Sequence, residues 1–271
     1  MIVLLCGEGP TDVGKDEYNP FTAQYEWKNG TIPIFIQRIL GTLDAKNVEF
    51  RCVTDKMLLK LQRKKEGKQH SAGQRRRRKE GFPSDGKPSQ PNYGHAQTAA
   101  ALLEYADSNG ITYDIVGMYK DTDRETGKKN TVIEARKKHD EVVKQIHEGF
   151  LDKENAFAAV PIRILENWLI ADENALKGLK ERGGNDKNIK SISNPEELWG
   201  SHNDRTSNYP KYYLERILRQ LNVPEENNTD AFCSIAESAD LEVLKNKCGS
   251  FSMFCEELTV AYWNAYQSDD T

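Results

Sequence analysis

Hydrophobic residues over the first 175 positions fall into two alternating patterns. Short runs composed mainly of apolar residues predict buried strands over residues 2–6, 50–53, 114–119 and 156–164. Between these runs, apolar residues recur every three or four positions, which predicts helices over 31–43, 56–65, 96–109 and 131–148. Strands that alternate with helices in this way are typical of an α/β fold, in which helices cover both faces of a parallel sheet.

The pattern changes near residue 176, after which no convincing strand follows. Pro210 begins an amphipathic helix, Asp240 caps another that stops at Gly249, and apolar residues from Phe251 to Tyr262 mark a last one. We therefore predict an α/β domain over residues 1–175, with an insertion at 60–93, and a helical C-terminal region over 176–271.

Composition narrows the class of protein. The chain has 271 residues, 30% of them charged, and a mean hydropathy of −0.74. No apolar run approaches the length of a membrane span, and no basic segment precedes the first apolar run, which reads as a strand and not as a secretory signal. The five cysteines form no C-x-x-C pair, which is typical of reduced thiols. These features predict a cytoplasmic protein without a membrane partner.

The charge is distributed very unevenly. The net charge is −4, but residues 60–80 hold ten Lys and Arg against two Glu, or +8, which leaves −12 for the rest. Such a stretch is either a solvated loop or a contact for a polyanion that orders on binding, and we favour nucleic-acid backbone. The candidate nucleic-acid-binding residues are Lys64, Lys65, Arg75, Arg76, Arg77, Arg78 and Lys79.

Acidic residues follow three of the four predicted strands. Glu8 and Asp12 follow the first, Asp121 and Asp123 the third, and Glu166 the fourth. The carboxyl ends of parallel strands share one edge of a sheet, so these side chains can converge there. Carboxylate clusters suit Mg²⁺ or Mn²⁺, which prefer oxygen ligands. This arrangement predicts a divalent metal site.

Simpler interpretations exist for each motif alone. Residues 9–15 match the phosphate loop G-x-x-x-x-G-K, but Asp16 stands where that motif needs Ser or Thr, and the acids around it would repel a nucleotide. The first turn can be a capped turn, D-x-D can cap a helix, and Glu166 can cap a helix or hold Arg163. Lys120, Lys211 and His95 are weaker candidates for phosphate contact than for ordinary surface roles, and the histidines lack zinc-ligand spacing.

Taken together, Gly7-Glu8-Gly9-Pro10-Thr11-Asp12 after one strand and Asp121-Thr122-Asp123 after a later one resemble the topoisomerase–primase (TOPRIM) domain. The E-G-x-x-D form is closer to the nucleases of the overcoming-lysogenization-defect group. The run from Leu165 to Asp172, LENWLIAD, is further similar to an uncharacterised bacterial TOPRIM-like family often encoded beside ATPases in phage-defence loci. The resemblance covers residues 1–175, and the long basic insertion departs from it.

This resemblance implies roles for individual residues. Glu8, Asp12, Asp121 and Asp123 would hold the metal, and Glu8, Asp121, Asp123 and Glu166 would be the catalytic residues. The implied function is a Mg²⁺-dependent endonuclease acting on DNA or structured RNA in anti-phage defence, with a separately encoded ATPase as a further partner. Two alternatives stay open, a non-catalytic module that binds nucleic acid or an ATPase, and a primase-like nucleotidyltransferase.

Overall fold

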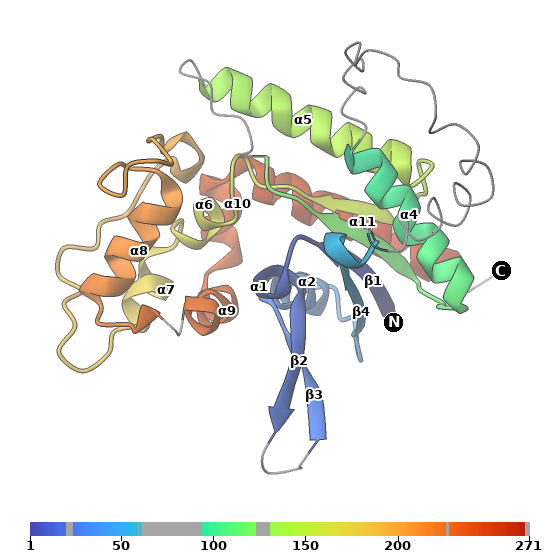
Figure 1. Cartoon of the computed structure of the whole chain (residues 1–271), viewed down its shortest axis with the longest axis horizontal. Coiled ribbons are helices and arrows are strands. Elements are labelled where there is room, and N and C mark those ends of the chain that lie inside the picture. Colours follow the sequence, from blue (N-terminus) through green and yellow to red (C-terminus); the bar gives the residue numbers. More distant parts are fainter. Residues whose placement is uncertain (20–23, 59, 61–93, 123–130, 226–227, 269–271) are drawn as a thin grey trace, which may run out of the picture.

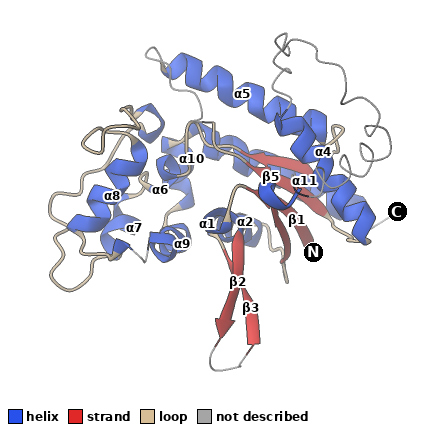
Figure 2. Ribbon diagram, viewed as in Figure 1, coloured by secondary structure: helices blue, strands red, loops and turns tan. Residues whose placement is uncertain are grey.

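A four-stranded parallel sheet forms the centre of the protein (Figures 1 and 2). The computed structural model describes residues 1–19, 24–58, 60, 94–122, 131–225 and 228–268. The strands are β1 (Ile2–Gly7), β4 (Glu49–Thr54), β5 (Ile115–Tyr119) and β6 (Ala156–Ala159), in the order β4-β1-β5-β6. Each neighbouring pair is parallel, which confirms the predicted α/β fold.

Helices cover both faces of this sheet. Alternate residues of β1 enter different cores, with Val3 and Leu5 on one side and Leu4 and Cys6 on the other, as the period of two in a strand requires. The first side packs against α2 (Thr31–Gly41) and α11 (Gly249–Ser268), and the second against α4 (Gly94–Asn109) and α5 (Val132–Gly149). Thr131 and Glu134 form a capping box at the start of α5.

One local prediction is wrong, and one pair of strands was not predicted. The fourth strand ends at Ala159 and not at residue 164, because Pro161 cannot donate to a ladder and Arg163 has φ of +80°, which leaves the extended region. The polar stretch after the first strand is an antiparallel hairpin of β2 (Gly14–Asn19) and β3 (Gln24–Asn29), which projects from the body in Figure 1. The predicted helix over 56–65 lies largely outside the described residues.

The C-terminal region is helical, as predicted. Its elements are α6 (Glu166–Leu169), α7 (Glu173–Gly178), the 3₁₀ turn η2 (Pro195–Glu197), α8 (Pro210–Gln220), α9 (Asn228–Ser238) and α10 (Leu241–Lys247), followed by α11. Helix α9 was not predicted. Helix α11 returns to pack against β6, so the last segment of the chain completes one layer over the sheet. No described helix is both long and apolar enough to cross a membrane.

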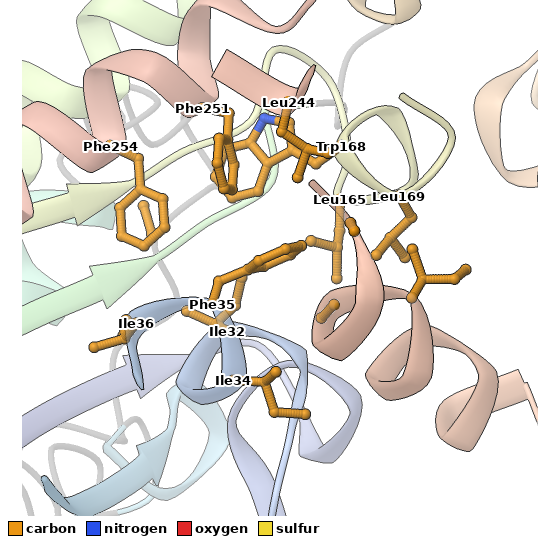
Figure 3. Close-up of a cluster of buried hydrophobic side chains, with 14 of the residues drawn as sticks. Ile32, Ile34, Phe35, Ile36, Leu165, Trp168, Leu169, Leu244, Phe251 and Phe254 are labelled. Atoms are coloured by element: carbon orange, nitrogen blue, oxygen red, sulfur yellow. The ribbon is translucent and has the colours of Figure 1, made fainter. Parts of the chain in front are cut away.

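An aromatic cluster joins α6 to α11 (Figure 3). The Trp168 ring lies 5.2 Å from the Phe251 ring and is stacked on Phe254 at 5.6 Å, while Phe35 from α2 contacts both Trp168 and Phe251 edge-on. The Trp168 indole N–H donates to Ser250 Oγ at 2.8 Å, so its polar atom is satisfied inside the core. This cluster fixes α6, whose first residue is Glu166, against the sheet.

Candidate active site at the carboxyl edge of the sheet

Acidic residues from all four strand ends lie near one another. Glu8 follows β1, Asp55 follows β4, Asp121 lies two residues beyond β5, and Glu166 begins α6 after β6. Because the strands are parallel, their carboxyl ends meet at one edge, where sheet proteins of this kind bind ligands. Asp55 was missed by the sequence analysis, although its position directly after an apolar strand was a usable signal.

Asp121 is held at the centre of this edge. Its Oδ1 accepts a hydrogen bond from the hydroxyl of buried Tyr119 and another from the Leu165 backbone N–H at 3.1 Å. Its own N–H donates to Glu8 Oε1 at 3.3 Å. Burial, followed by the negative charges of Glu166 and Glu8, raises the pKa of Asp121 well above its ordinary value.

Asp12 has both a structural role and a charged environment. It lies in the one-turn helix α1 (Pro10–Val13), where its Oδ2 accepts from the Gly9 N–H at 2.9 Å, so the capped-turn interpretation holds for this residue. Burial and the charge of Glu8 nevertheless raise the pKa of Asp12 to about 7, with smaller contributions from Glu166 and Asp55. The two interpretations of this turn are therefore compatible.

Lys120 forms ion pairs with two of the acidic residues at this edge, Glu8 and Asp55. Its Nζ lies 3.0 Å from Glu8 Oε1 and 2.5 Å from Asp55 Oδ2, and only 7% of its side chain is exposed. Burial disfavours the ammonium, but the hydrogen bond to Asp55 and the charge of Glu8 outweigh it, so the pKa of Lys120 is raised. Asp55 is anchored in turn by the Cys6 thiol, which donates to Oδ1 at 3.3 Å. Lys120 is thus a buried, charged part of the site.

Two further residues border this edge. His95 begins α4, and burial together with the charge of Lys120 lowers the pKa of its imidazole, so it is neutral at pH 7. Arg163 has φ of +80°, an uncommon backbone conformation for a side chain of this size. Its N–H donates to Thr122 Oγ1 at 2.8 Å, and the Thr122 N–H donates to its carbonyl at 2.8 Å. These two bonds tie the segment after β5 to the segment after β6.

Several predicted site residues lie elsewhere or outside the described part of the chain. Asp123 and the candidate nucleic-acid-binding residues Lys64, Lys65, Arg75, Arg76, Arg77, Arg78 and Lys79 lie outside the described residues. Asp172, the last residue of the LENWLIAD run that carries part of the resemblance, caps α7 and accepts from the Asp240 N–H at 2.9 Å, which is a structural role. Lys211 is an exposed residue in α8. Gly14 and Lys15 begin a strand, whereas the phosphate-loop alternative requires a helix there.

The donor set fits a hard divalent cation in its chemistry. Asp12 and Asp121 offer oxygen ligands whose pKa values are raised by burial first and then by the negative charges of neighbouring carboxylates. Within the described ranges, however, no three His, Cys, Asp or Glu side chains stand in an arrangement ready to hold a metal ion. Binding would therefore require these carboxylates to turn toward a common point.

The fold and this edge define an α/β protein whose parallel sheet carries coupled carboxylates and a buried lysine at its carboxyl end. The chain belongs to the family described as Domain of unknown function (DUF4276), whose model matches residues 30–259. That match includes Asp55, Asp121 and Glu166, and it begins after Glu8 and Asp12. No curated protein and no solved structure matches the chain at a significant level.

Proposed function

We propose that this protein is a Mg²⁺- or Mn²⁺-dependent phosphodiester hydrolase, an endonuclease that acts on DNA or structured RNA. The observation that carries the proposal is the convergence of Glu8, Asp12 and Asp121 at one sheet edge, where burial and then the charges of neighbouring carboxylates, Glu8 among them, raise the pKa of both Asp12 and Asp121. Carboxylates crowded in this way are costly to the fold, and such groups cluster at functional sites. A divalent cation would lower that cost.

In the proposed reaction, Glu8, Asp12, Asp121 and Asp123 would hold the metal. A bound divalent ion activates water and stabilises the charge that develops on phosphate. Tyr119 and the Leu165 N–H keep one Asp121 oxygen oriented, and Lys120 supplies a fixed positive charge beside Glu8. Glu166, whose charge raises the pKa of both Asp12 and Asp121, is the remaining candidate catalytic residue.

The proposed substrate and partners rest on the sequence. The basic stretch at residues 60–80 follows β4 in the chain, and all of it except residue 60 lies outside the described residues. Lysine and arginine side chains neutralise the phosphates of nucleic acid largely independently of its sequence. We therefore favour a phosphate backbone over an acidic protein as the ligand of this stretch. The role in anti-phage defence and the separately encoded ATPase partner are proposals taken from the resemblance described above.

The test is cleavage of supercoiled DNA and of folded tRNA by the full chain with Mg²⁺ or Mn²⁺, compared with EDTA. We expect Asp121→Asn and Glu8→Gln to lower the cleavage rate at least about 100-fold, because both remove a charge that would face the metal. The matched control is Asp107→Asn, an exposed carboxylate on α4, which should cleave at the wild-type rate. Equal rates for Asp121→Asn and wild type would overturn the proposal.

A non-catalytic binding module is the second candidate, favoured by the lack of a ready metal arrangement within the described residues. In that case Asp121→Asn would leave nucleic-acid binding and protection against phage intact. Replacing Arg75, Arg76, Arg77 and Arg78 by Ala would abolish both activities. For the endonuclease, Asp121→Asn retains binding and loses protection, so the two variants together separate the candidates.

A further inference from the structure

Trp199 is an exposed aromatic residue that contacts the segment carrying Glu166. Of the four tryptophans in the chain, Trp168 is buried, Trp27 belongs to the hairpin and Trp263 to α11. Trp199 lies two residues after η2, and 40% of it is exposed. A single exposed aromatic ring is ordinary on a protein surface, so its surroundings decide whether this one has a role.

The Arg163 guanidinium lies over the Trp199 ring. Its central carbon is 4.4 Å from the ring centroid, within the range of a cation–π contact. Only 2% of Arg163 is exposed, so the ring face beneath the guanidinium is covered and the exposed part of Trp199 lies away from this contact. The ring is therefore held on one side by a cation inside the protein and meets solvent elsewhere.

The chain on either side of Trp199 is also held in place. Three residues earlier, Glu196 accepts from the N–H groups of Gly249 and Ser250, both at 3.0 Å, which ties η2 to α11. The next residue, Gly200, packs so closely that a Cβ there would lie 2.3 Å from the Tyr209 backbone nitrogen. An aromatic ring that is fixed in this way loses little conformational freedom when a flat ligand stacks on it.

Arg163 connects this ring to the candidate active site. Its N–H donates to Thr122 Oγ1 and its carbonyl accepts from the Thr122 N–H, both at 2.8 Å, and Thr122 directly follows Asp121. Two residues after Arg163, the Leu165 N–H donates to Asp121 Oδ1 at 3.1 Å. The φ of +80° at Arg163 is a strained conformation of the kind that clusters at functional sites. One short, fixed segment therefore joins Trp199 to the acidic edge.

Proteins that bind single-stranded nucleic acid stack its bases on aromatic side chains, a contact that tolerates any sequence because every base has a π-face. A base inside a duplex is stacked on its neighbours and must leave the duplex to reach such a ring. We propose that Trp199 stacks on an unpaired nucleobase, so that the protein binds single-stranded, looped or flipped-out nucleotides beside the acidic edge. This inference rests on the proposed function, because it takes nucleic acid as the ligand, and it narrows the substrate to nucleic acid with unpaired bases.

The experiment measures, by fluorescence anisotropy, how tightly the full chain binds a labelled oligothymidylate in EDTA. The comparison ligand is an abasic oligonucleotide of the same length, which keeps the phosphates and lacks the bases. We expect the wild-type chain to prefer oligothymidylate, and Trp199→Ala to lose about 10-fold in affinity for oligothymidylate alone. Trp199→Phe keeps an aromatic ring and should retain most of the affinity. Trp263→Ala removes a ring that is 46% exposed on α11, so it is the matched control and should bind as the wild type does.

The outcomes distinguish this inference from the proposed function. Equal affinity of the wild-type chain for the two oligonucleotides would overturn the inference and leave the endonuclease proposal standing. An equal loss on both ligands in Trp199→Ala would also overturn it, because the ring would then only hold Arg163 in place. Base-dependent binding without metal-dependent cleavage would keep the stacking contact and overturn the endonuclease, whereas no binding of either ligand would overturn both.

A second measurement covers the case in which Trp199→Ala does not fold, as judged by circular dichroism. Stacking of a base on Trp199 should quench tryptophan fluorescence when oligothymidylate binds, and the quenching should be smaller in Trp199→Phe. Quenching of the same size in Trp199→Phe and in the wild type would show that no base stacks on this ring.

Discussion

Two regions of the molecule hold carboxylates away from water. In one the carboxylate is surrounded by hydrogen-bond donors, and in the other the carboxylates lie beside further negative charges. Glu196, a residue of η2, is buried against the start of α11, where it accepts from the N–H groups of Gly249 and Ser250, both at 3.0 Å, and from the Ser250 hydroxyl. At the sheet edge, Asp12 and Asp121 accept fewer hydrogen bonds and lie beside other carboxylates.

The difference shows which region serves the fold. Glu196 meets the N-terminus of α11, where unpaired N–H groups and the helix dipole favour a negative charge, and it thereby locks α11 onto the C-terminal region. The acids at the edge oppose one another, so a fold selected for stability alone has no reason to keep them together. This contrast supports the proposal that the edge, and not the Glu196 joint, is the functional site.

The largest expected effect on stability is at the Glu196 joint. Glu196→Ala leaves two N–H groups at the start of α11, one of them buried, without their acceptor, so we expect the free energy of unfolding to fall by about 3–4 kcal/mol. Urea denaturation measures this loss. The control is Glu197→Ala, an exposed neighbour that should change stability by less than about 0.5 kcal/mol. Similar losses for both variants would contradict the comparison.

A smaller effect is expected for Asp12→Asn, which should make the folded protein more stable than the wild type at high pH. The pKa of Asp12 is about 7 in the folded protein and near 3.8 when unfolded, so the folded state binds its proton more tightly. Its contribution to stability is therefore complete below about pH 4 and lost as the pH rises through 7. Allowing for partial exposure, we expect the metal-free wild-type chain to lose about 2 kcal/mol over this range through Asp12.

Asp12→Asn keeps the oxygen that accepts from Gly9 and removes the charge, so this part of the pH dependence should disappear. Denaturation at pH 5 and pH 8, in the presence of EDTA, measures the difference. Asp107→Asn is the matched control and should retain the wild-type slope. If Asp12→Asn loses as much stability between pH 5 and pH 8 as the wild type does, the pKa of Asp12 is not raised in the folded protein.

Divalent metal should stabilise the edge by a smaller amount. At ten times its dissociation constant, Mn²⁺ should raise the free energy of unfolding by about 1.4 kcal/mol at pH 8. At pH 5 the effect should be weaker, because protons compete for Asp12 and Asp121. Thermal denaturation with and without Mn²⁺ measures both values. Asp121→Asn should lose the stabilisation, whereas Glu197→Ala should retain it, and equal shifts in these two variants would argue against a metal at the edge.

The sequence predicted the elements whose hydrophobic pattern is determined by the sheet. Residues 2–6 and 115–119 carry no charged side chain because both faces of β1 and β5 are covered. The hairpin could not be predicted in this way, because β3 has no buried face and its large side chains, Tyr25 and Trp27, are exposed. A strand without a core-facing side carries no period-two signal.

The proximity of the acidic residues was predicted in part, for a comparable reason. Glu8, Asp12, Asp121 and Glu166 follow apolar segments directly, so topology alone brings them together. The contact of Lys120 with Asp55 joins positions 65 residues apart and exists because β4 and β5 both flank β1. Nothing in the local sequence around either residue shows which strand neighbours which, so this charge balance becomes visible only in the folded chain.

The smallest effect concerns the hydrogen bond that orients Asp121. Tyr119→Phe removes the hydroxyl that donates to Asp121 Oδ1 without changing the size of the buried ring, so we expect a loss of about 1 kcal/mol in the free energy of unfolding. The loss should be greater at pH 8 than at pH 5, because a donor stabilises the ionised carboxylate more than the protonated one. Urea denaturation at both pH values measures it. Tyr105→Phe on α4, whose hydroxyl has no hydrogen-bond partner among the described residues, is the control, and an equal loss in both variants would show that Tyr119 acts through packing alone.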